Sequence, residues 1–496
     1  MISYLWPLAL LYCVSCSSVK QANFNPAQKI SPAKLRSDFT LLQNILEENH
    51  PSLYWYTSKD SVDYYFKTIN ESLRDSLTEL QFRNRTAWML GKLRCGHTIV
   101  RSSKPYTQYF LSKRLPTFPL SLKVWQDSAV LVTNYNRDSV LKRGTIVTAI
   151  NNRPTSTVLD SICQFISTDG YANNLKYQLL SFNFPAYYKN TFGLDSQYVI
   201  SYVDSTGTAT NKTVKNYDPK TDSSFRRTPL DPKGISRRQF KDFATWGNRN
   251  MLVDTALSTA ILSVNTFSEG KLKKFVRKSF RKMKQQNIKN VVLDLRQNSG
   301  GNILLSTNLC QYLADKPFRV ADTVAAFTRS FPYRKYIRPW FVYWVSMHLS
   351  GRRYADGRIH FRYFEKHRFK PKKKNHFDGD IYIVTGGYTF SAAALATSTL
   401  KGQQNVTVVG EETGGGAYGN SAMHLPTITL PHSGLRVTLP LYRLVLDEKR
   451  PKNGRGIFPD IEVRPSSTAI KRGVDSKLEK VKELITEKRK AANSIL

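Results

Sequence analysis

The sequence predicts a multidomain α+β chain with a helical N-terminal region, a β-rich middle domain and an α/β core. Between residues 30 and 98, apolar residues recur at helical spacing. In the first segment they are Leu35, Phe39, Leu42 and Leu46. Residues 119–210 contain short strand-like runs, and from 245 to 466 strand-like and helix-like runs alternate, as in an α/β fold. The 496 residues and 41% hydrophobic content are enough for several cores.

The chain starts with an apolar segment of signal-peptide length, from Leu5 to Val14, so we expect export. The segment 14–18, VSCSS, resembles a bacterial lipobox in which Cys16 is lipidated. We therefore expect residues 1–16 to be a signal peptide with a lipobox, and the protein to be a membrane-anchored lipoprotein of the bacterial cell envelope, in the periplasm or at the outer membrane. Two features depart from the pattern: no Lys or Arg precedes the apolar run, and Cys13 stands where Leu is usual.

The helical region 30–98 ends beside His97. The pattern Thr78-x-x-Gln81 predicts a capping box at the start of the last helix, and Gly96 predicts its end. A helix C-terminus favours a cation, and a histidine of near-neutral pKa can act as a general base. Cys95 is a poor nucleophile for this histidine, because close neighbours in a chain rarely meet as nucleophile and base.

The β-rich region 119–210 contains Leu141 to Asn152, which follows two strand-like runs. This stretch resembles the GxxIxxINxxP signature of PDZ-like domains, with Pro154 in place. Such domains capture extended chains by adding a strand to a sheet edge. The carboxylate-binding loop of a standard PDZ domain is not evident. Recognition of polypeptide tails and a purely structural role therefore both remain open.

In the core, a predicted buried strand ends at Gly386-Gly387, and Ser391 follows just before the helix-forming run Ala392 to Ala396. Ser391 would lie at the helix N-cap or first turn, where unpaired N–H groups and the helix dipole favour developing negative charge. That is how a nucleophile with an oxyanion site is presented. The alternative is a serine that only caps the helix.

A second predicted strand, from Val291, runs into Gly300-Gly301, where glycine allows backbone to approach a ligand closely. A plain turn is the alternative. Four motifs then occur in order: DLRQNSGG, TFSAA, VGEETG and GIFPD, at 294–301, 389–393, 409–414 and 456–460. Together they resemble the C-terminal processing (tail-specific) serine peptidases and the tricorn core protease. The similarity covers roughly residues 35–463.

This resemblance implies an α/β core of the crotonase/ClpP-like kind with Ser391 as nucleophile. It also implies that the backbone N–H of Ala392 and of Gly300 or Gly301 form the oxyanion hole. The base of the processing-peptidase branch is a lysine, but that position falls at about Gly416 and is empty. Lys401 is ten residues from Ser391, roughly 15 Å along a helix. The tricorn-like branch uses a histidine after the helical region, which implies His97 as base.

The tricorn arrangement adds a serine before the histidine and a glutamate that orients it. Here Gly96 occupies the serine position, so the orienting network must differ. Asp447 or Glu448, shortly before the GIFPD motif, is the candidate acid, and it could hold the imidazole tautomer. The alternative is an acid of a surface loop, since two cations follow directly.

Two functions follow from this pattern. The first is an exported serine endopeptidase that cleaves polypeptides through an acyl-enzyme on Ser391, with His97 as general base. The second is a catalytically inactive relative of the same fold that binds peptides or hydrophobic ligands. No spacing of His, Cys and Asp matches a metal-ligand set, so we expect neither metal nor cofactor.

An insertion at 329–374 has 14 Lys or Arg against 2 acids, interleaved with aromatic residues. Such segments can lie on anionic membrane surfaces; the alternative is a solvated basic face with aromatics packed beneath. The formal net charge of +37 attracts polyanions, but no recognition motif indicates nucleic acid. Residues 470–496 are expected to form an exposed, charged C-terminal helix.

Overall fold

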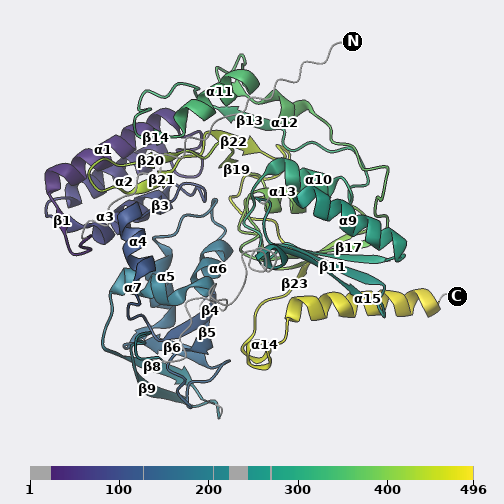
Figure 1. The fold of residues 1–496 in the computed structure, drawn as a ribbon, viewed down its shortest axis with the longest axis horizontal. Coiled ribbons are helices and arrows are strands. Elements are labelled where there is room, and N and C mark those ends of the chain that lie inside the picture. Colours follow the sequence, from purple (N-terminus) through teal and green to yellow (C-terminus); the bar gives the residue numbers. More distant parts are fainter. Residues whose placement is uncertain (1–23, 127, 205, 223–243, 269–270, 495–496) are drawn as a thin grey trace.

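The computed structural model describes residues 24–494 apart from 127, 205, 223–243 and 269–270. The predicted signal peptide and lipobox, including Cys16, lie outside these residues, so export and lipidation remain predictions. Along the described part of the chain, no helix has both the length and the apolarity needed to cross a membrane. Figure 1 shows three regions: the N-terminal helices at the upper left, the β-rich region at the lower left and the α/β core at the right.

The N-terminal region is mainly helical, as the apolar spacing predicts. Its elements are β1 (Lys29–Ile30), α1 (Pro32–Asn49), α2 (Lys59–Ser72), β2 (Leu77–Thr78), α3 (Glu79–Lys92), β3 (Val100–Arg101) and α4 (Lys104–Ser112). The apolar stripe of α1 is fully buried, and the capping box of Thr78 and Gln81 is present at the start of α3. The capping box fixes where α3 begins, and α3 leads to His97.

The middle region is a mixed sheet-and-helix unit. Its elements are β4 (Leu120–Trp125), β5 (Ser128–Asn134), β6 (Ile146–Ile150), β7 (Arg153–Pro154), α5 (Thr155–Cys163), α6 (Asn174–Phe182), α7 (Phe184–Phe192), β8 (Gln197–Val203) and β9 (Ala209–Lys215). The strands run in the order β4-β5-β6-β8-β9. A bridge between Thr117 and Tyr217 brings the two sheet edges together. On the outer edge of β4, the Val124 N–H donates to Ser181 Oγ of α6 at 2.9 Å.

The core is a six-stranded sheet in the order β10-β11-β12-β17-β18-β23. These strands are β10 (Arg249–Asp254), β11 (Thr259–Val264), β12 (Asn290–Asp294), β17 (Asp380–Thr385), β18 (Val406–Gly410) and β23 (Ile461–Glu462). All neighbours are parallel except β10 and β11. Loops at the carboxyl ends of β12 and β17 therefore emerge side by side, which is where parallel sheets place ligands.

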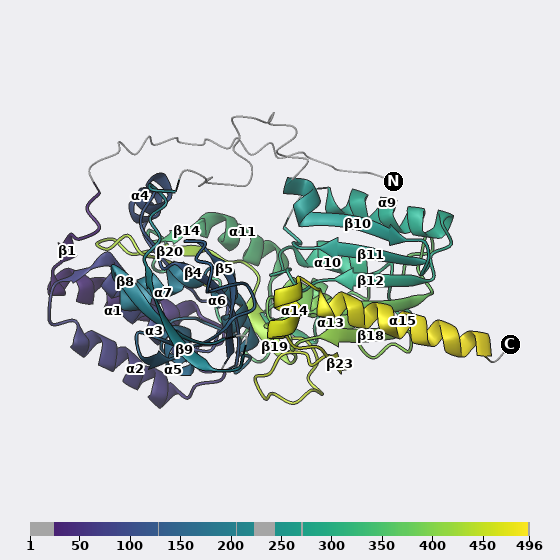
Figure 2. The same ribbon diagram turned by 90° about the horizontal axis from the view of Figure 1, so that it is seen from below.

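Helices cover both faces of this sheet. On one face lie α9 (Leu272–Gln285), α10 (Ile303–Cys310) and α13 (Ala392–Leu400), which share a hydrophobic core with the strands. After α14 (Ser467–Arg472), the C-terminal α15 (Ser476–Ser494) lies along the other face (Figure 2). The expectation of a wholly exposed C-terminal helix needs correction. Val481 and Ile485 are buried against the sheet, because apolar residues at helical spacing give α15 one apolar stripe.

Two smaller sheets cover the end of the core. Their strands and helices are β13 (Thr323–Ala326), β14 (Ile337–Arg338), α11 (Trp340–Ser350), β15 (Arg352–Arg353), β16 (Ile359–His360), α12 (Arg362–Lys366), β19 (Gly419–Ala422), β20 (Thr427–Thr429), β21 (Arg436–Thr438) and β22 (Tyr442–Val445). One sheet has the order β14-β20-β21-β3. Because β3 belongs to the N-terminal region, this pairing fixes the residues just after His97 onto the core.

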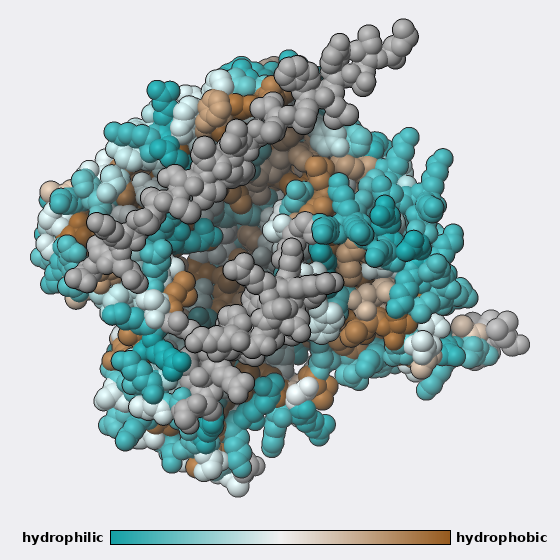
Figure 3. Space-filling model, viewed as in Figure 1, coloured by the Kyte–Doolittle hydropathy of each residue, from teal (hydrophilic) through white to brown (hydrophobic). Residues whose placement is uncertain are grey.

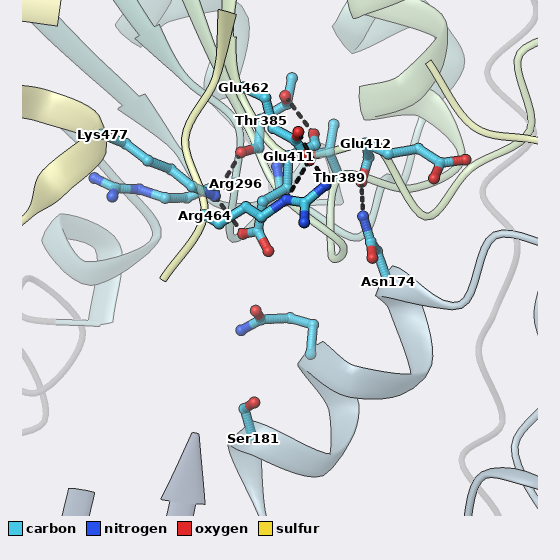
Figure 4. A network of polar contacts seen from close by, with 12 residues as sticks. Asn174, Ser181, Arg296, Thr385, Thr389, Glu411, Glu412, Glu462, Arg464 and Lys477 are labelled. Atoms are coloured by element: carbon cyan, nitrogen blue, oxygen red, sulfur yellow. Dashed lines mark hydrogen bonds and ion pairs between the residues drawn. The ribbon is translucent and has the colours of Figure 1, made fainter. Parts of the chain in front are cut away.

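The β-rich region also contacts the core at the loops that follow β17 and β18, as Figure 4 shows. Asn174, at the start of α6, donates from Nδ2 to the Glu412 carbonyl at 3.1 Å. From the start of α15, Lys477 Nζ donates to the Thr385 carbonyl at 2.8 Å and pairs with Glu411 at 2.6 Å. These contacts hold the carboxyl ends of β17 and β18 in place.

The basic insertion follows neither of its two sequence interpretations completely. Phe364 is buried, whereas Phe341, Val342 and Leu349 of α11 are exposed by 58%, 54% and 83%. Figure 3 shows hydrophobic residues at the surface near α11. Contact of this helix with a membrane surface therefore remains a prediction, which vesicle binding of a Phe341→Ser variant would test.

Candidate active site

Ser391 lies where the strand, turn and helix pattern predicts, at the N-cap of α13. Its backbone has φ 51° and ψ −123°, a strained conformation for a residue other than glycine that costs about 1–3 kcal/mol. A capping serine would accept a hydrogen bond from the next turn, but the Ser391 side chain makes no such bond. The simple capping interpretation is therefore wrong. The strained turn instead projects the hydroxyl away from its own helix.

That hydroxyl meets His97, which is 294 residues away in the chain: the His97 Nε2 to Ser391 Oγ distance is 3.1 Å. The imidazole also packs against the Phe390 ring, with centroids 4.7 Å apart and planes 33° from parallel. His97 is 8% exposed and lines the same cavity as Ser391. The end of α3 and the pairing of β3 with the core together bring the His97 ring next to Ser391.

Glycine at position 96 has a steric explanation. A Cβ at Gly96 would lie 2.7 Å from Phe390 Cζ and 3.1 Å from the Asp169 nitrogen. A serine here would push His97 away from the ring on which it packs. The departure from the tricorn pattern therefore follows from the close packing of the His97 loop on Phe390.

Hydrogen bonds join the loop that carries Ser391 to the loop that carries Gly300. The Phe390 N–H donates to the Asn298 carbonyl at 3.0 Å, and Thr389 Oγ1 donates to the Leu295 carbonyl at 2.9 Å. Asn298 is fully buried, and its side chain bonds the Val264 carbonyl and the Gly300 N–H, each at 2.8 Å. Sequence reasoning assigned no role to Asn298 or Thr389, although both lie inside the family motifs.

The two glycines differ in what their N–H groups can do. The Gly300 N–H already donates to Asn298, whereas those of Gly301 and Ala392 have no partner within the described residues. A Cβ at Gly300 would lie 2.6 Å from Ser391 Cβ and 3.0 Å from the Ala392 nitrogen. Gly300 therefore keeps the space in front of the α13 N-terminus open. With φ of 105° and 133°, Gly300 and Gly301 also have backbone conformations that favour glycine.

Burial lowers the pKa of His97 to about 4, because the charged ring would lose its hydration. Its Nδ1 is buried and has no hydrogen-bond partner in the part of the chain that the structure describes. The ring is therefore neutral near pH 7, which is the form that can accept a proton. Among the described residues, no carboxylate bonds to the ring to orient it.

The structure does not bring Asp447 or Glu448 to His97. Glu448 accepts a hydrogen bond from Thr323 Oγ1 at 2.8 Å, and Asp447 pairs with Arg450 at 3.3 Å. Both acids belong to the loop after β22 and are satisfied there. The surface-loop alternative fits these contacts.

Asp169 is an acid that bonds to the His97 loop, and no sequence motif marks it. It is 2% exposed, accepts the Gly96 N–H at 2.8 Å, and its other oxygen has no partner among the described residues. Burial raises the pKa of Asp169 to about 7, although hydrogen bonds from the N–H groups of Gly96 and Gly416 oppose this. Asp169 therefore supports the backbone before His97 rather than its ring.

No lysine of the described residues lines the cavity of Ser391, so neither expected lysine position supplies a Ser-Lys pair. A Cβ at Gly416, the position of the processing-peptidase lysine, would lie 2.5 Å from the Gly419 carbonyl oxygen. Lys401 Nζ is held by Asp460 and the Phe458 carbonyl, each at 2.6 Å.

Cys95 is also disfavoured as the nucleophile. Burial raises the pKa of the Cys95 thiol to about 11, which disfavours a thiolate.

Comparison with known proteins finds one family model and several similar folds. Residues 258–463 match the family model of peptidase family S41. No curated protein matches the chain. Among solved structures, mature CPAF is similar over 92% of this chain and 97% of its own, with TM-score 0.64 and 14% identity. CPAF complexed with lactacystin is similar over 93% and 99%, with TM-score 0.64 and 13% identity. These likenesses concern the fold.

Proposed function

Because the core of this chain, residues 258–463, belongs to peptidase family S41, we propose that the protein is a serine endopeptidase that forms an acyl-enzyme on Ser391. The observation that carries this proposal is the 3.1 Å contact between His97 Nε2 and Ser391 Oγ. The two side chains meet at the N-terminus of α13, in a cavity of about 660 Å³. Polypeptides are the substrates of the family.

In the first step His97 Nε2 removes the proton of Ser391 Oγ while the oxygen attacks the scissile carbonyl carbon. The C–N bond then breaks, and the imidazolium gives its proton to the leaving amine. Water repeats the sequence on the acyl-enzyme, with His97 taking its proton and returning it to Ser391. Burial keeps His97 neutral at rest, so the base is available at neutral pH.

The developing oxyanion would be held by the N–H groups of Gly301 and Ala392. Both are without partners among the residues described, and Ala392 lies in the first turn of α13. Unpaired donors and the helix dipole stabilise negative charge there. Gly300 is proposed to contribute space rather than a donor, since its N–H is bonded to Asn298.

One observation favours the inactive, ligand-binding alternative. His97 Nδ1 has no acceptor in the described part of the chain, so nothing fixes the tautomer that presents Nε2 as base. The unpaired oxyanion donors and the strained Ser391 backbone favour the peptidase, because a binding protein needs neither.

The β-rich region is proposed to have a docking role rather than to capture peptide tails at β4. Ser181 Oγ occupies the Val124 N–H on the outer edge of that strand, where an added strand would need it. Asn174 of the same helix bonds the Glu412 carbonyl. If tail peptides bind a Ser181→Gly variant and the wild type equally well, this role is wrong.

Labelling with a fluorophosphonate probe tests the proposed function directly. We expect the wild-type protein to be labelled on a single serine, because the probe needs an activated hydroxyl and an oxyanion site. Peptide mass spectrometry should locate the label on Ser391, and Ser391→Ala should remove it. No labelling of the folded wild type, or labelling that persists in Ser391→Ala, would contradict the proposal.

The pH profile tests the base. We expect kcat/KM to be half-maximal near pH 4 and level at pH 5.5, because burial lowers the pKa of His97 to about 4 and only the neutral ring accepts a proton. The same shift makes the folded state bind fewer protons than the unfolded state as pH falls from 6.5 towards 4, so stability also decreases in that window.

Circular dichroism at each pH should therefore accompany the rates, to separate unfolding from titration. Asp169→Asn is the control, since burial raises the pKa of Asp169 to about 7 and its titration could overlap the profile. If kcat/KM of both the wild type and Asp169→Asn is half-maximal near pH 6.5, His97 is not buried as described.

A further inference from the structure

The cavity that contains Ser391 and His97 has an uneven charge distribution. Its walls include apolar side chains, among them Phe165, Leu175 and Leu179, and two arginines, Arg83 and Arg101. No Asp or Glu from the described residues lines it. A cleft with cations and no acids in a low-dielectric wall attracts negative charge.

Arg83, from the first half of α3, is the most informative of these residues. Its guanidinium carries five N–H donors, but its one hydrogen bond among the described residues is to Asn84 Oδ1, at 3.3 Å. It forms no ion pair there. Burial lowers the pKa of Arg83, although Tyr187, Tyr106 and Glu79 act in the opposite direction.

The acid on the same helix favours the charged form of Arg83 electrostatically, but among the described residues it makes no direct hydrogen bond or ion pair with Arg83. Glu79 lies one turn earlier, but its two oxygens accept from the Ser103 N–H and Ser103 Oγ, each at 2.7 Å. On the neighbouring strands, Arg101 pairs in register with Arg436, and burial together with Arg436 lowers the pKa of Arg101. Among the described residues, three arginines thus lie near this side of the cavity, and the acid beside them, Glu79, already accepts hydrogen bonds from Ser103.

The backbone next to these arginines can accept a substrate strand. The strand β3 is at the edge of its sheet, begins three residues after His97, and lines the cavity through Val100 and Arg101. An extended polypeptide can pair with such an edge and pass the catalytic residues. Arg83 is nine residues before Lys92 at the end of α3, about 14 Å along the axis, or about four residues of an extended chain.

We propose that Arg83 forms a subsite that binds a carboxylate of the substrate, so that the cleft selects extended polypeptide segments with an acidic residue several positions from the scissile bond. This inference rests on the proposed peptidase function. A substrate carboxylate would give Arg83 the bidentate partner that the protein itself does not provide. The high positive charge of the chain would assist the encounter.

Three fluorogenic peptides of equal length test the subsite: one with an internal Glu and an amidated C-terminus, one with Gln in its place, and the Gln peptide with a free C-terminus. We expect wild-type kcat/KM to be about tenfold or more higher for the Glu peptide than for the amidated Gln peptide. A gain for the free C-terminus instead would identify the terminal carboxylate as the ligand.

Arg83→Gln should reduce the ratio to about one by lowering kcat/KM for the acidic peptide alone. The matched control is Arg85→Gln, on the same helix, whose guanidinium bonds Ser72 instead of lining the cavity. Arg83→Glu should reverse the preference towards a Lys peptide, which a merely misfolded variant cannot do. Equal ratios in wild type and Arg83→Gln, or no wild-type preference, would overturn the proposal.

Failure of this inference can be separated from failure of the proposed function. Binding of the three peptides to Ser391→Ala, followed by fluorescence anisotropy, reports the subsite without turnover. If the wild type takes no fluorophosphonate label but the Glu peptide still binds in preference to the Gln peptide, the subsite stands and the peptidase proposal falls. If the wild type is labelled but binds the Glu and Gln peptides equally, the peptidase proposal stands and the subsite proposal falls.

Discussion

Replacing His97 by alanine is expected to lower kcat for peptide hydrolysis by about 10⁴-fold with little change in KM. The ring lies 3.1 Å from Ser391 Oγ, and no lysine of the described residues lines their cavity to replace it as base. Because the His97 contact is with the nucleophile, its loss should act on the chemical step. Steady-state kinetics on the Glu peptide measure the change.

A matched control exists within the same chain. His424 Nε2 lies 3.0 Å from Ser346 Oγ, and burial lowers the pKa of His424 to about 4, as it does for His97. Ser346 lies in the middle of α11, where backbone N–H groups are used by the helix and cannot hold an oxyanion. His424→Ala should therefore keep turnover. Equal losses in the two variants would contradict the assignment of His97 as base.

Gly300→Ala is expected to lower kcat by about 10²–10³-fold, the effect of losing one oxyanion donor or its approach. The new Cβ would lie 2.6 Å from Ser391 Cβ and 3.0 Å from the Ala392 nitrogen, in the space where the oxyanion would form. Fluorophosphonate labelling should slow in proportion, since the probe's tetrahedral adduct needs the same space.

Backbone strain alone must be separated from this clash. Gly402→Ala provides the control, because Gly402 has a similar φ of 95° and a Cβ there would meet nothing within 4 Å. In thermal unfolding Gly402→Ala should lose stability through backbone strain alone, and Gly300→Ala should lose more because of the added clash, but only Gly300→Ala should lose activity. If Gly402→Ala loses as much activity, or Gly300→Ala keeps full labelling, the oxyanion site is not where we propose.

Much of the local structure could be predicted from the sequence. The apolar run and glycine pair before Ser391, and the Ala-rich run after it, predicted β17, the turn and α13. These elements depend on neighbours in the chain, through hydrophobic period, glycine conformations and helix propensity. The stripe of α15 could have been found in the same way, but its many charges obscured it.

The support around the site could not be predicted in this way. Asp169 lies 72 residues after His97 in the chain and belongs to no motif, yet it holds the Gly96 N–H. Asp447 and Glu448 had the right chemistry and order, but a contact with His97 depends on where the loop after β22 lies, and there both acids have other partners.

The sequence by itself therefore determined the elements that present Ser391, the glycines beside it and the membership of the core in a peptidase family. The tertiary structure decided the rest: which N–H groups remain unpaired, why position 96 has no side chain, and the 3.1 Å contact of His97 with Ser391 across 294 residues. The physical reason is that hydrophobic period and backbone preference act within a few residues. Hydrogen-bond partners and steric limits, in contrast, are set by segments that only the packing of α3, β3 and the core brings together.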